Sequence, residues 1–200
     1  MIITVAGFKG GIGKTTTALH LAAFFSMTLK SERVLVVDGD PNQFCLGVSK
    51  RGQLPFEVCS LMSAPRASQG MEHIVIDTEG NPDKADIEEF SKGSDLVVLP
   101  CTVDSMAIEA VLNAVDSLTT LKRYGVVLTM IDSRQRSTTE QARSGLKSVG
   151  IPVFKQGIRR FVAYQKAALK GVPVYDVTDE NARIAWGEYV ALGKEIVSHV

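Results

Sequence analysis

A glycine-rich stretch near the amino terminus constrains the fold of this chain more than any other feature. It runs Gly7-Phe8-Lys9-Gly10-Gly11-Ile12-Gly13-Lys14-Thr15-Thr16-Thr17 and directly follows the apolar run Ile2–Ala6. Helical periodicity begins inside it and continues over Lys14–Leu29. The order strand, glycine-rich turn, helix is what a phosphate-binding loop requires. Glycine lets backbone N–H groups curl inward, and the following helix directs its positive end at the same point.

The side chains of this loop predict a ligand as well as a fold. Lys14 is placed to reach the β- and γ-phosphates of ATP, and the Thr15 hydroxyl to bind Mg²⁺. The predicted nucleotide-binding residues are Gly10, Gly11, Ile12, Gly13, Lys14, Thr15 and Thr16. The alternative is a plain glycine-rich turn with two exposed lysines.

The rest of the chain alternates strand and helix patterns. Its Val/Ile/Leu runs lack polar alternation, which is typical of strands that are covered on both faces. We therefore predict an α/β fold of the P-loop NTPase type: one domain over residues 1–200, with a doubly wound, mostly parallel sheet and helices on both faces. The predicted strands are Ile2–Ala6, Arg33–Val37, His73–Ile76, Leu96–Pro100, Gly125–Ile131 and Pro152–Phe154. The predicted helices are Lys14–Leu29, Ser105–Leu121, Thr138–Val149, Phe161–Leu169 and Glu180–Val197, and Gln43–Gly70 has only weak periodicity.

Two aspartates follow predicted strands. Asp38 comes after Val36-Val37, and Asp77 comes after the run His73–Ile76. Because ligands bind at the carboxyl ends of parallel strands, Asp38 is predicted to position the attacking water and Asp77 to bind Mg²⁺. Thr15, Asp38 and Asp77 form the predicted metal set. The alternative for Asp38 is a helix N-cap or turn residue, and for Asp77 a turn residue. Asp40 precedes a proline, which is common in turns.

The loop departs from the common pattern at two positions. Phe8 stands where the first glycine is usual, and Lys9 follows it. This form resembles the deviant Walker A motif of the ParA/MinD superfamily, and Asp38-Gly39-Asp40-Pro41 resembles its ParA/Soj/ParF-like branch, with Asn42 in place of the usual glutamine. The resemblance implies a weakly active ATPase that forms a sandwich homodimer on ATP binding. Lys9 would then act on the partner's phosphates, and the implied catalytic residues are Lys9, Lys14 and Asp38.

The net charge of zero hides an uneven distribution. Between Ser133 and Lys170 there are nine basic residues and one acid, so this segment carries +8 and the remainder −8. In ParA-type proteins a carboxyl-terminal basic patch holds the protein on non-specific DNA. The predicted DNA contacts, expected to share one helix face, are Arg159, Arg160, Lys166 and Lys170. An ordinary solvated face is the alternative.

The resemblance also implies a biological role. A ParA-type ATPase positions or segregates a cargo, which is a plasmid, a chromosome or a protein organelle such as a carboxysome, and a ParB-like or adaptor partner stimulates its hydrolysis. A MinD-like membrane-associated ATPase needs a lysine-rich amphipathic terminal helix, whereas the last 20 residues combine Lys194 with Glu188 and Glu195. A dethiobiotin-synthetase-like enzyme needs a second polar substrate pocket, and the sequence offers no such constellation.

Composition predicts the compartment. Met1–Val5 lacks the basic region of a signal peptide, and no apolar run reaches the ~18 residues of a membrane span. Cys45, Cys59 and Cys101 have no metal-ligand spacing and are predicted to be reduced core or surface thiols. We expect a cytoplasmic, nucleoid-associated protein without a membrane partner. Because the first predicted strand starts at Ile2, we expect no operator-reading helix-turn-helix before it.

Overall fold

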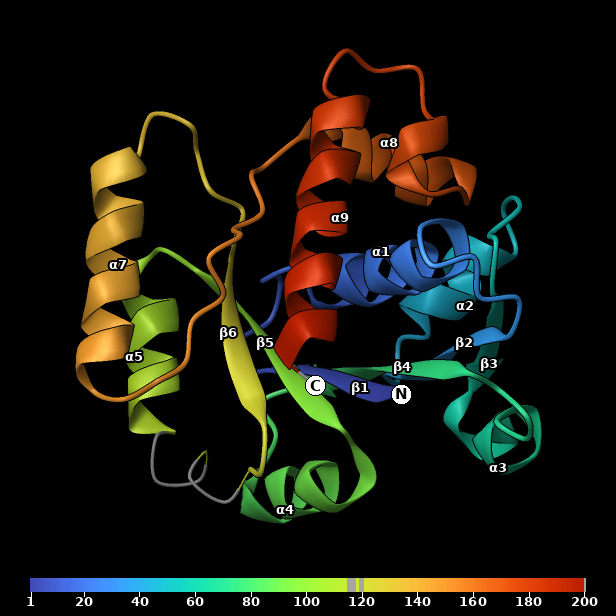
Figure 1. Ribbon diagram of the computed structural model, residues 1–200, viewed down its shortest axis with the longest axis horizontal. Helices are drawn as coiled ribbons and strands as arrows, with labels where there is room; N and C mark the ends of the chain where they lie inside the picture. Colours follow the sequence, from blue (N-terminus) through green and yellow to red (C-terminus); the bar gives the residue numbers. More distant parts are fainter. Residues whose placement is uncertain (115–117, 119–120, 200) are drawn as a thin grey trace.

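The computed structural model describes residues 1–114, 118 and 121–199 and contains one six-stranded sheet (Figure 1). The strand order is β3-β2-β4-β1-β5-β6, and every pairing between neighbouring strands is parallel. The strands are β1 Ile2–Gly7, β2 Val34–Gly39, β3 Glu57–Ser60, β4 His73–Gly80, β5 Leu96–Thr102 and β6 Tyr124–Thr129. The predicted α/β fold with a parallel sheet is therefore confirmed.

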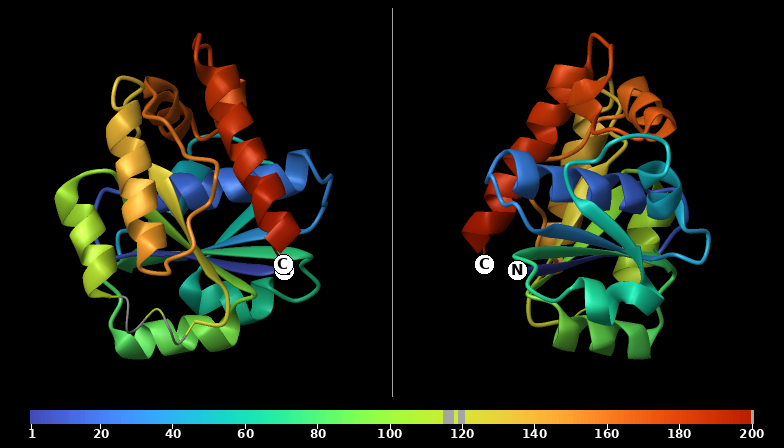
Figure 2. Two further views of the ribbon diagram at one scale, coloured as in Figure 1. Left: turned by 60° about the vertical axis from the view of Figure 1, so that its left-hand side comes forward. Right: turned by 90° about the vertical axis from the view of Figure 1, so that its right-hand side faces the viewer.

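Helices cover both faces of the sheet (Figures 1 and 2). On one face lie α1 Lys14–Met27, α2 Phe44–Ser49, α8 Val162–Lys170 and α9 Ala182–His199, with the 3₁₀ turn η2 Val174–Asp176. The other face is covered by α4 Lys84–Gly93, α5 Ser105–Asn113 and α7 Arg136–Ser148. The 3₁₀ turn η1 Leu61–Ser63 and the short helix α3 Ala64–Ala67 follow β3.

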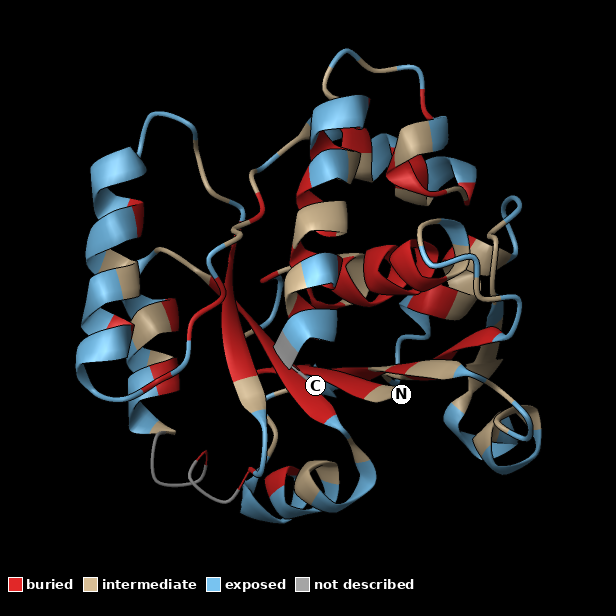
Figure 3. Cartoon of the chain, in the orientation of Figure 1, coloured by how far each residue is buried: buried red, intermediate tan, exposed pale blue. Residues whose placement is uncertain are grey.

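Alternate residues of each strand pack into two separate cores. On β5, Val98 joins the core beneath α1 and α9, while Val97 and Leu99 join the core beneath α4, α5 and α7. Both sets are buried (Figure 3), which explains why the strands have no polar alternation. The apolar side of α9 supplies Tyr189, Leu192 and Ile196 to the first core. None of the helices described here has the length and apolar character needed to cross a membrane.

Several element boundaries differ from the prediction. The weakly periodic stretch Gln43–Gly70 contains α2, the edge strand β3, η1 and α3. Pro152–Phe154 makes only an isolated bridge between Val126 and Val153. The helix predicted over Ser105–Leu121 is described as α5 up to Asn113, and residues 115–117 and 119–120 lie outside the described residues. Helix α4 was not predicted, although Asp83 and Asp86 form a capping box at its start.

The topology brings the predicted motifs together. β4 lies between β1 and β2, so the carboxyl ends of these three strands meet at one edge of the sheet. Asp38 on β2 and Asp77 on β4 are direct partners in the register. The glycine-rich loop leaves β1 at the same edge.

Candidate nucleotide-binding site

The loop between β1 and α1 has the backbone of a phosphate cradle. Gly11 and Gly13 have φ angles of 74° and 92°, in the left-handed region that favours glycine. Gly13 also caps α1, which begins at Lys14. The amino terminus of a 14-residue helix therefore points at this loop, where it favours an anion.

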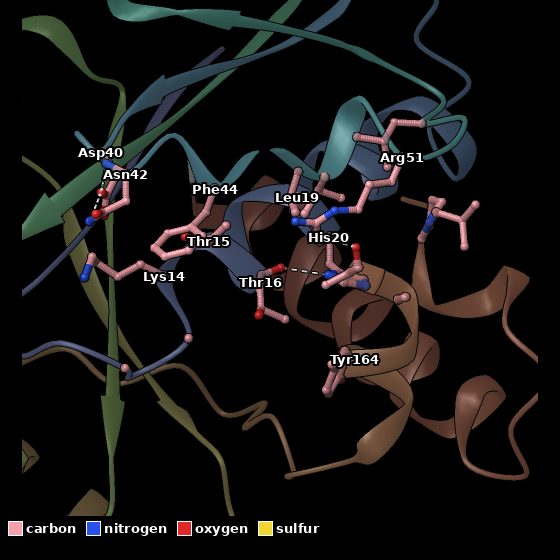
Figure 4. Close-up of a pocket in the computed structure, with 18 of the residues that line it drawn as sticks. Lys14, Thr15, Thr16, Leu19, His20, Asp40, Asn42, Phe44, Arg51 and Tyr164 are labelled. Atoms are coloured by element: carbon pink, nitrogen blue, oxygen red, sulfur yellow. Dashed lines mark hydrogen bonds between the residues drawn. The ribbon is translucent and has the colours of Figure 1, made fainter. Parts of the chain in front are cut away.

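Lys14 lies inside the cradle and is only 8% exposed. A Cβ added to Gly80, at the end of β4, would lie 3.4 Å from Lys14 Nζ, so Gly80 keeps the space in front of the ammonium open. Figure 4 shows Lys14 beside Thr15, with Asp40 and Asn42 of the loop after β2 on the same side of the pocket. The sequence identified Lys14 and Thr15, but it gave Gly80 no role.

Asp77 is completely buried next to Thr15. Its Oδ2 accepts a hydrogen bond from Thr15 Oγ1 at 2.7 Å, whereas Oδ1 has no hydrogen-bond partner in the described part of the chain. Burial raises the pKa of Asp77 to about 6, although the hydrogen bonds from Thr15 and Cys45 oppose this shift. A buried carboxylate with an open oxygen beside a hydroxyl is a suitable donor set for Mg²⁺, so the residues present fit the predicted ion.

Asp38 is also buried but is engaged by the backbone. Its Oδ2 accepts from the N–H of Leu46 at 2.9 Å, in the first turn of α2, and its Oδ1 accepts from the N–H of Asp40 at 3.3 Å. Asp38 thus accepts a free backbone N–H at the start of α2, which is the helix-capping alternative considered for it from the sequence. The structure also places Asp38 directly opposite Asp77 in the register of β2 and β4.

Lys9 lies in a different environment from Lys14. Its side chain is 37% exposed, and Nζ forms an ion pair with Asp104 at 2.9 Å. Asp104 caps α5 by accepting from the N–H of Ala107, and hydrogen bonds from Thr102 and Lys9 lower its pKa to about 2. One loop therefore presents a buried lysine to its own cradle and a second lysine at the surface.

A cavity of about 540 Å³ extends from the loop along α1 towards α2 and α8 (Figure 4). Besides loop residues it is lined by Leu19 and His20 of α1, Phe44 of α2 and Tyr164 of α8. No sequence pattern predicts this wall, because its members come from three helices that meet only in the folded chain. A smaller cavity of about 240 Å³ touches Gly13 and Thr16 on the side of Arg159 and Phe161.

His20 connects α1 with the segment after α8. Its Nδ1 bonds to the carbonyl oxygen of Thr16 at 2.7 Å, and the N–H of Val174 donates to Nε2 at 3.2 Å. Its ring stacks on Tyr189. This pattern requires a neutral ring that carries its proton on Nδ1, because a proton on Nε2 would face the N–H of Val174.

The neutral state of His20 predicts acid-sensitive stability. Burial lowers its pKa from 6.5 to about 4, so below pH 6.5 the unfolded chain binds this proton and the folded chain does not. The stability advantage of wild type over His20→Gln should therefore be largest above pH 6.5 and shrink by about 3 kcal/mol as the pH falls to 4. Urea unfolding across this range measures it. The raised pKa of Asp77 makes stability depend on pH in the opposite direction, but Asp77 is present in both proteins, so its effect cancels when their stabilities are subtracted. A stability difference between wild type and His20→Gln that does not change with pH would contradict the prediction.

The four predicted DNA-contacting residues do not lie on one helix. α8 begins at Val162, so Arg159 and Arg160 precede it, and Arg159 instead bridges to Ile131. Arg159 forms an ion pair with the buried Glu188, and Lys166 forms one with Asp179 at 2.7 Å. Within the described residues, Arg160 and Lys170 form no ion pair, and both are exposed. The expected helical face is therefore wrong as a description of the structure.

Comparison with known proteins agrees with this geometry. The model of the "CobQ/CobB/MinD/ParA nucleotide binding domain" family matches residues 3–174. The chain is 34% identical over 206 residues to "Maintenance of carboxysome distribution protein A" of Gloeobacter kilaueensis, covering 98% of this chain and 93% of that protein. It is 23% identical over 257 residues to "Chromosome partitioning protein ParA" of Caulobacter vibrioides, covering 98% and 94%.

A solved structure has the same fold. The putative plasmid partition protein of Borrelia burgdorferi bound to AMPPNP superposes with a TM-score of 0.73 at 18% identity, covering 100% of this chain and 99% of the other. The same family is indicated by three observations: the match to the family model, the similarity to the two relatives, and the glycine-rich loop with its two lysines. The chain therefore belongs to the CobQ/CobB/MinD/ParA nucleotide-binding domain family, as a P-loop ATPase of its ParA branch.

Proposed function

We propose that this chain dimerises on binding Mg·ATP, binds DNA non-specifically in that state and positions a cargo through partner-stimulated hydrolysis. The contrast between Lys14, buried in its own cradle, and Lys9, whose side chain lies outside it and is 37% exposed, carries the proposal. A lysine outside its own cradle is available to a second protomer. The similarity to "Maintenance of carboxysome distribution protein A" favours a carboxysome-like organelle as the cargo, with a plasmid or chromosome as the alternatives.

Within one protomer, the proposed roles follow from position. The backbone N–H groups of Gly10–Thr16 and the ammonium of Lys14 bind the phosphates, and the Thr15 hydroxyl and Asp77 hold Mg²⁺. Magnesium supplies positive charge to the phosphate oxygens when it is bound. Asp38 orients the attacking water from the neighbouring strand.

Lys9 has to leave Asp104 before it acts on a partner's phosphates. Both groups are more than one-third exposed, so this ion pair is weak, on the order of 0–1 kcal/mol. The phosphates of a nucleotide in the facing protomer carry more charge than one carboxylate. Closure of the dimer therefore favours the transfer of Lys9 from Asp104 to the partner's nucleotide.

A close contact connects the segment that follows α2 with α8. Arg51 Nη1 donates to the carbonyl oxygen of Ala168 at 3.0 Å. A Cβ added to Gly52 would lie only 2.3 Å from the carbonyl oxygen of Lys170. Asp38 accepts from the first turn of α2, so α2 and these contacts connect it to the end of α8, where Lys170 lies. This contact offers a route from nucleotide state to the proposed DNA-binding face on the nucleoid.

Charge reversal tests the DNA-binding part of the proposal. We expect Arg160→Glu with Lys170→Glu to weaken ATP-dependent DNA binding at least tenfold and to flatten its salt dependence, since each lost phosphate contact removes about 0.9 from the slope. Lys84→Glu with Lys92→Glu on α4 is the matched control, because that helix covers the opposite face of the sheet. Fluorescence anisotropy with a labelled duplex in ATP, ADP and no nucleotide measures both effects. Equal loss in the two double variants would contradict a localised surface.

A further inference from the structure

Cys45 lies beside the two buried aspartates at the edge of the sheet. Asp38, Cys45 and Asp77 are all buried, and each offers one ligand atom within 4.8 Å of the other two. Cys45 comes from the first turn of α2, whereas Asp38 and Asp77 come from neighbouring parallel strands. The sequence predicted Cys45 only as a core or surface thiol, because a spacing of seven residues from Asp38 and 32 from Asp77 resembles no metal-binding motif.

Hydrogen bonds do not satisfy all the buried oxygens of this cluster, although the Lys14 ammonium lies close enough to act against the raised pKa of Asp77. Asp77 Oδ1 is buried and has no hydrogen-bond partner among the residues described, although Oδ2 of the same carboxylate accepts from Thr15 Oγ1 at 2.7 Å and from Cys45 Sγ at 3.4 Å. Each oxygen of Asp38 accepts one backbone N–H and keeps a further lone pair. A buried carboxylate with one open oxygen, whose other oxygen contacts a thiol and which lies beside a second carboxylate, is a ligand set that can hold a cation.

We propose that Asp38, Cys45 and Asp77 bind one thiophilic divalent cation of the Zn²⁺ class in the absence of nucleotide. Magnesium takes oxygen ligands, whereas a sulfur ligand with two carboxylates suits Zn²⁺ or Co²⁺. Binding forms a metal–sulfur bond, and the thiol proton is released to solvent. Tetrahedral zinc keeps such ligands about 3.5 Å apart, so no two of the three atoms, which lie within 4.8 Å of one another, have to approach by more than about 1.3 Å.

The inferred site shares Asp38 and Asp77 with the proposed magnesium site, and in this respect it rests on the proposed function. The two ions therefore compete, and the zinc-loaded chain holds Asp77 and Asp38 away from the roles that hydrolysis needs. Cys45 is the ligand that distinguishes the two states, because Mg²⁺ does not use it. The result is an ATPase that a soft divalent cation inhibits and that a chelator reactivates.

Titration of the nucleotide-free chain with Co²⁺ tests the site directly. We expect one equivalent of Co²⁺ to produce a near-ultraviolet thiolate-to-cobalt charge-transfer band that Zn²⁺ abolishes by displacement. Cys45→Ser and Cys45→Ala should both lack the band and lose at least about tenfold in zinc affinity. Cys59→Ser is the matched control, since Cys59 is the more exposed thiol and would account for adventitious binding. It should keep the band.

The band overturns the proposal if it persists in both Cys45 variants, disappears in Cys59→Ser, or never forms. Circular dichroism confirms that each variant is folded. A second readout is the ratio of ATP turnover with and without Zn²⁺, which should fall in wild type and stay near one in Cys45→Ala. Binding of a fluorescent ATP analogue with Mg²⁺ separates the two ideas: if it binds but no band forms, only the thiophilic site fails. If the band forms without nucleotide binding, the ATPase proposal fails instead.

Discussion

Replacing Lys9 by alanine is expected to lower the rate of ATP hydrolysis by roughly 10³-fold while leaving nucleotide binding intact. Lys9 lies outside its own cradle and pairs with Asp104, so its removal takes no contact from the nucleotide of the same protomer. In the proposed dimer, what would be lost is a cation directed at the γ-phosphoryl group of the partner, where charge grows during transfer. Single-turnover hydrolysis of radiolabelled ATP measures the rate, and a fluorescent analogue measures binding.

Two further observations sharpen this test. Light scattering with a non-hydrolysable analogue should show a dimer for wild type and a shifted monomer–dimer equilibrium for Lys9→Ala. Lys92→Ala removes an exposed lysine on α4 and should behave as wild type in both assays. Turnover at the wild-type rate by Lys9→Ala would exclude the role of Lys9 in trans. A wild-type chain that stays monomeric with the analogue would contradict the whole dimer proposal.

The parts of the site that could be predicted from sequence are those whose residues are neighbours along the chain. The loop from Gly7 to Thr17 contains its own strand end, glycine turn and helix start, so its conformation depends little on distant residues. Asp38 and Asp77 were predictable because each follows an apolar run, and parallel strands bring such ends to one edge. Their roles as ligand or cap were not, because the same carboxylate serves both purposes.

The elements that sequence analysis missed depend on tertiary contacts. β3 pairs with β2 over only four residues at the edge of the sheet, which is too short for a periodic pattern. Arg159 appears in sequence as one of a run of basic residues, yet it forms an ion pair with Glu188 on α9, 29 residues away. A count of charged residues gives the net charge of a segment but does not show which of its charges form ion pairs. The unpaired basic surface of the folded chain is therefore smaller than the formal +8 suggests.

The carboxylate of Asp38 accepts hydrogen bonds from the loop after β2 and from the first turn of α2. Asp38 accepts from the backbone of Asp40 and of Leu46, and Arg51, two residues beyond α2, bonds to Ala168 of α8. A carboxylate that turns towards a nucleotide gives up these acceptor positions. In the proposed mechanism the same group would connect the hydrolysis site to the helix that carries Lys170, which makes Asp38 the most informative position after Lys9.

Asp38→Ala is expected to bind ATP and to hydrolyse it about 10²–10⁴-fold more slowly, so that the ATP-bound dimer accumulates on DNA. Loss of the capping interaction at α2 costs about 1 kcal/mol of stability in addition. Asp38→Asn separates these effects, because the amide oxygen still accepts the N–H of Leu46 but carries no charge. Hydrolysis by Asp38→Asn at the wild-type rate would show that Asp38 is only a helix cap.

Mixing the two variants tests both roles at once. In a heterodimer of Lys9→Ala and Asp38→Ala, the site on the Lys9→Ala protomer retains Asp38 and receives Lys9 from its partner, whereas the other site lacks both. Random pairing of an equal mixture should restore roughly a quarter of the wild-type rate, although each variant alone is at least about 10²-fold slower than wild type. If Lys9 acted within its own protomer, every site in the mixture would lack one group and no rate would return. The recovered rate should scale with the fraction of heterodimer as the mixing ratio is varied.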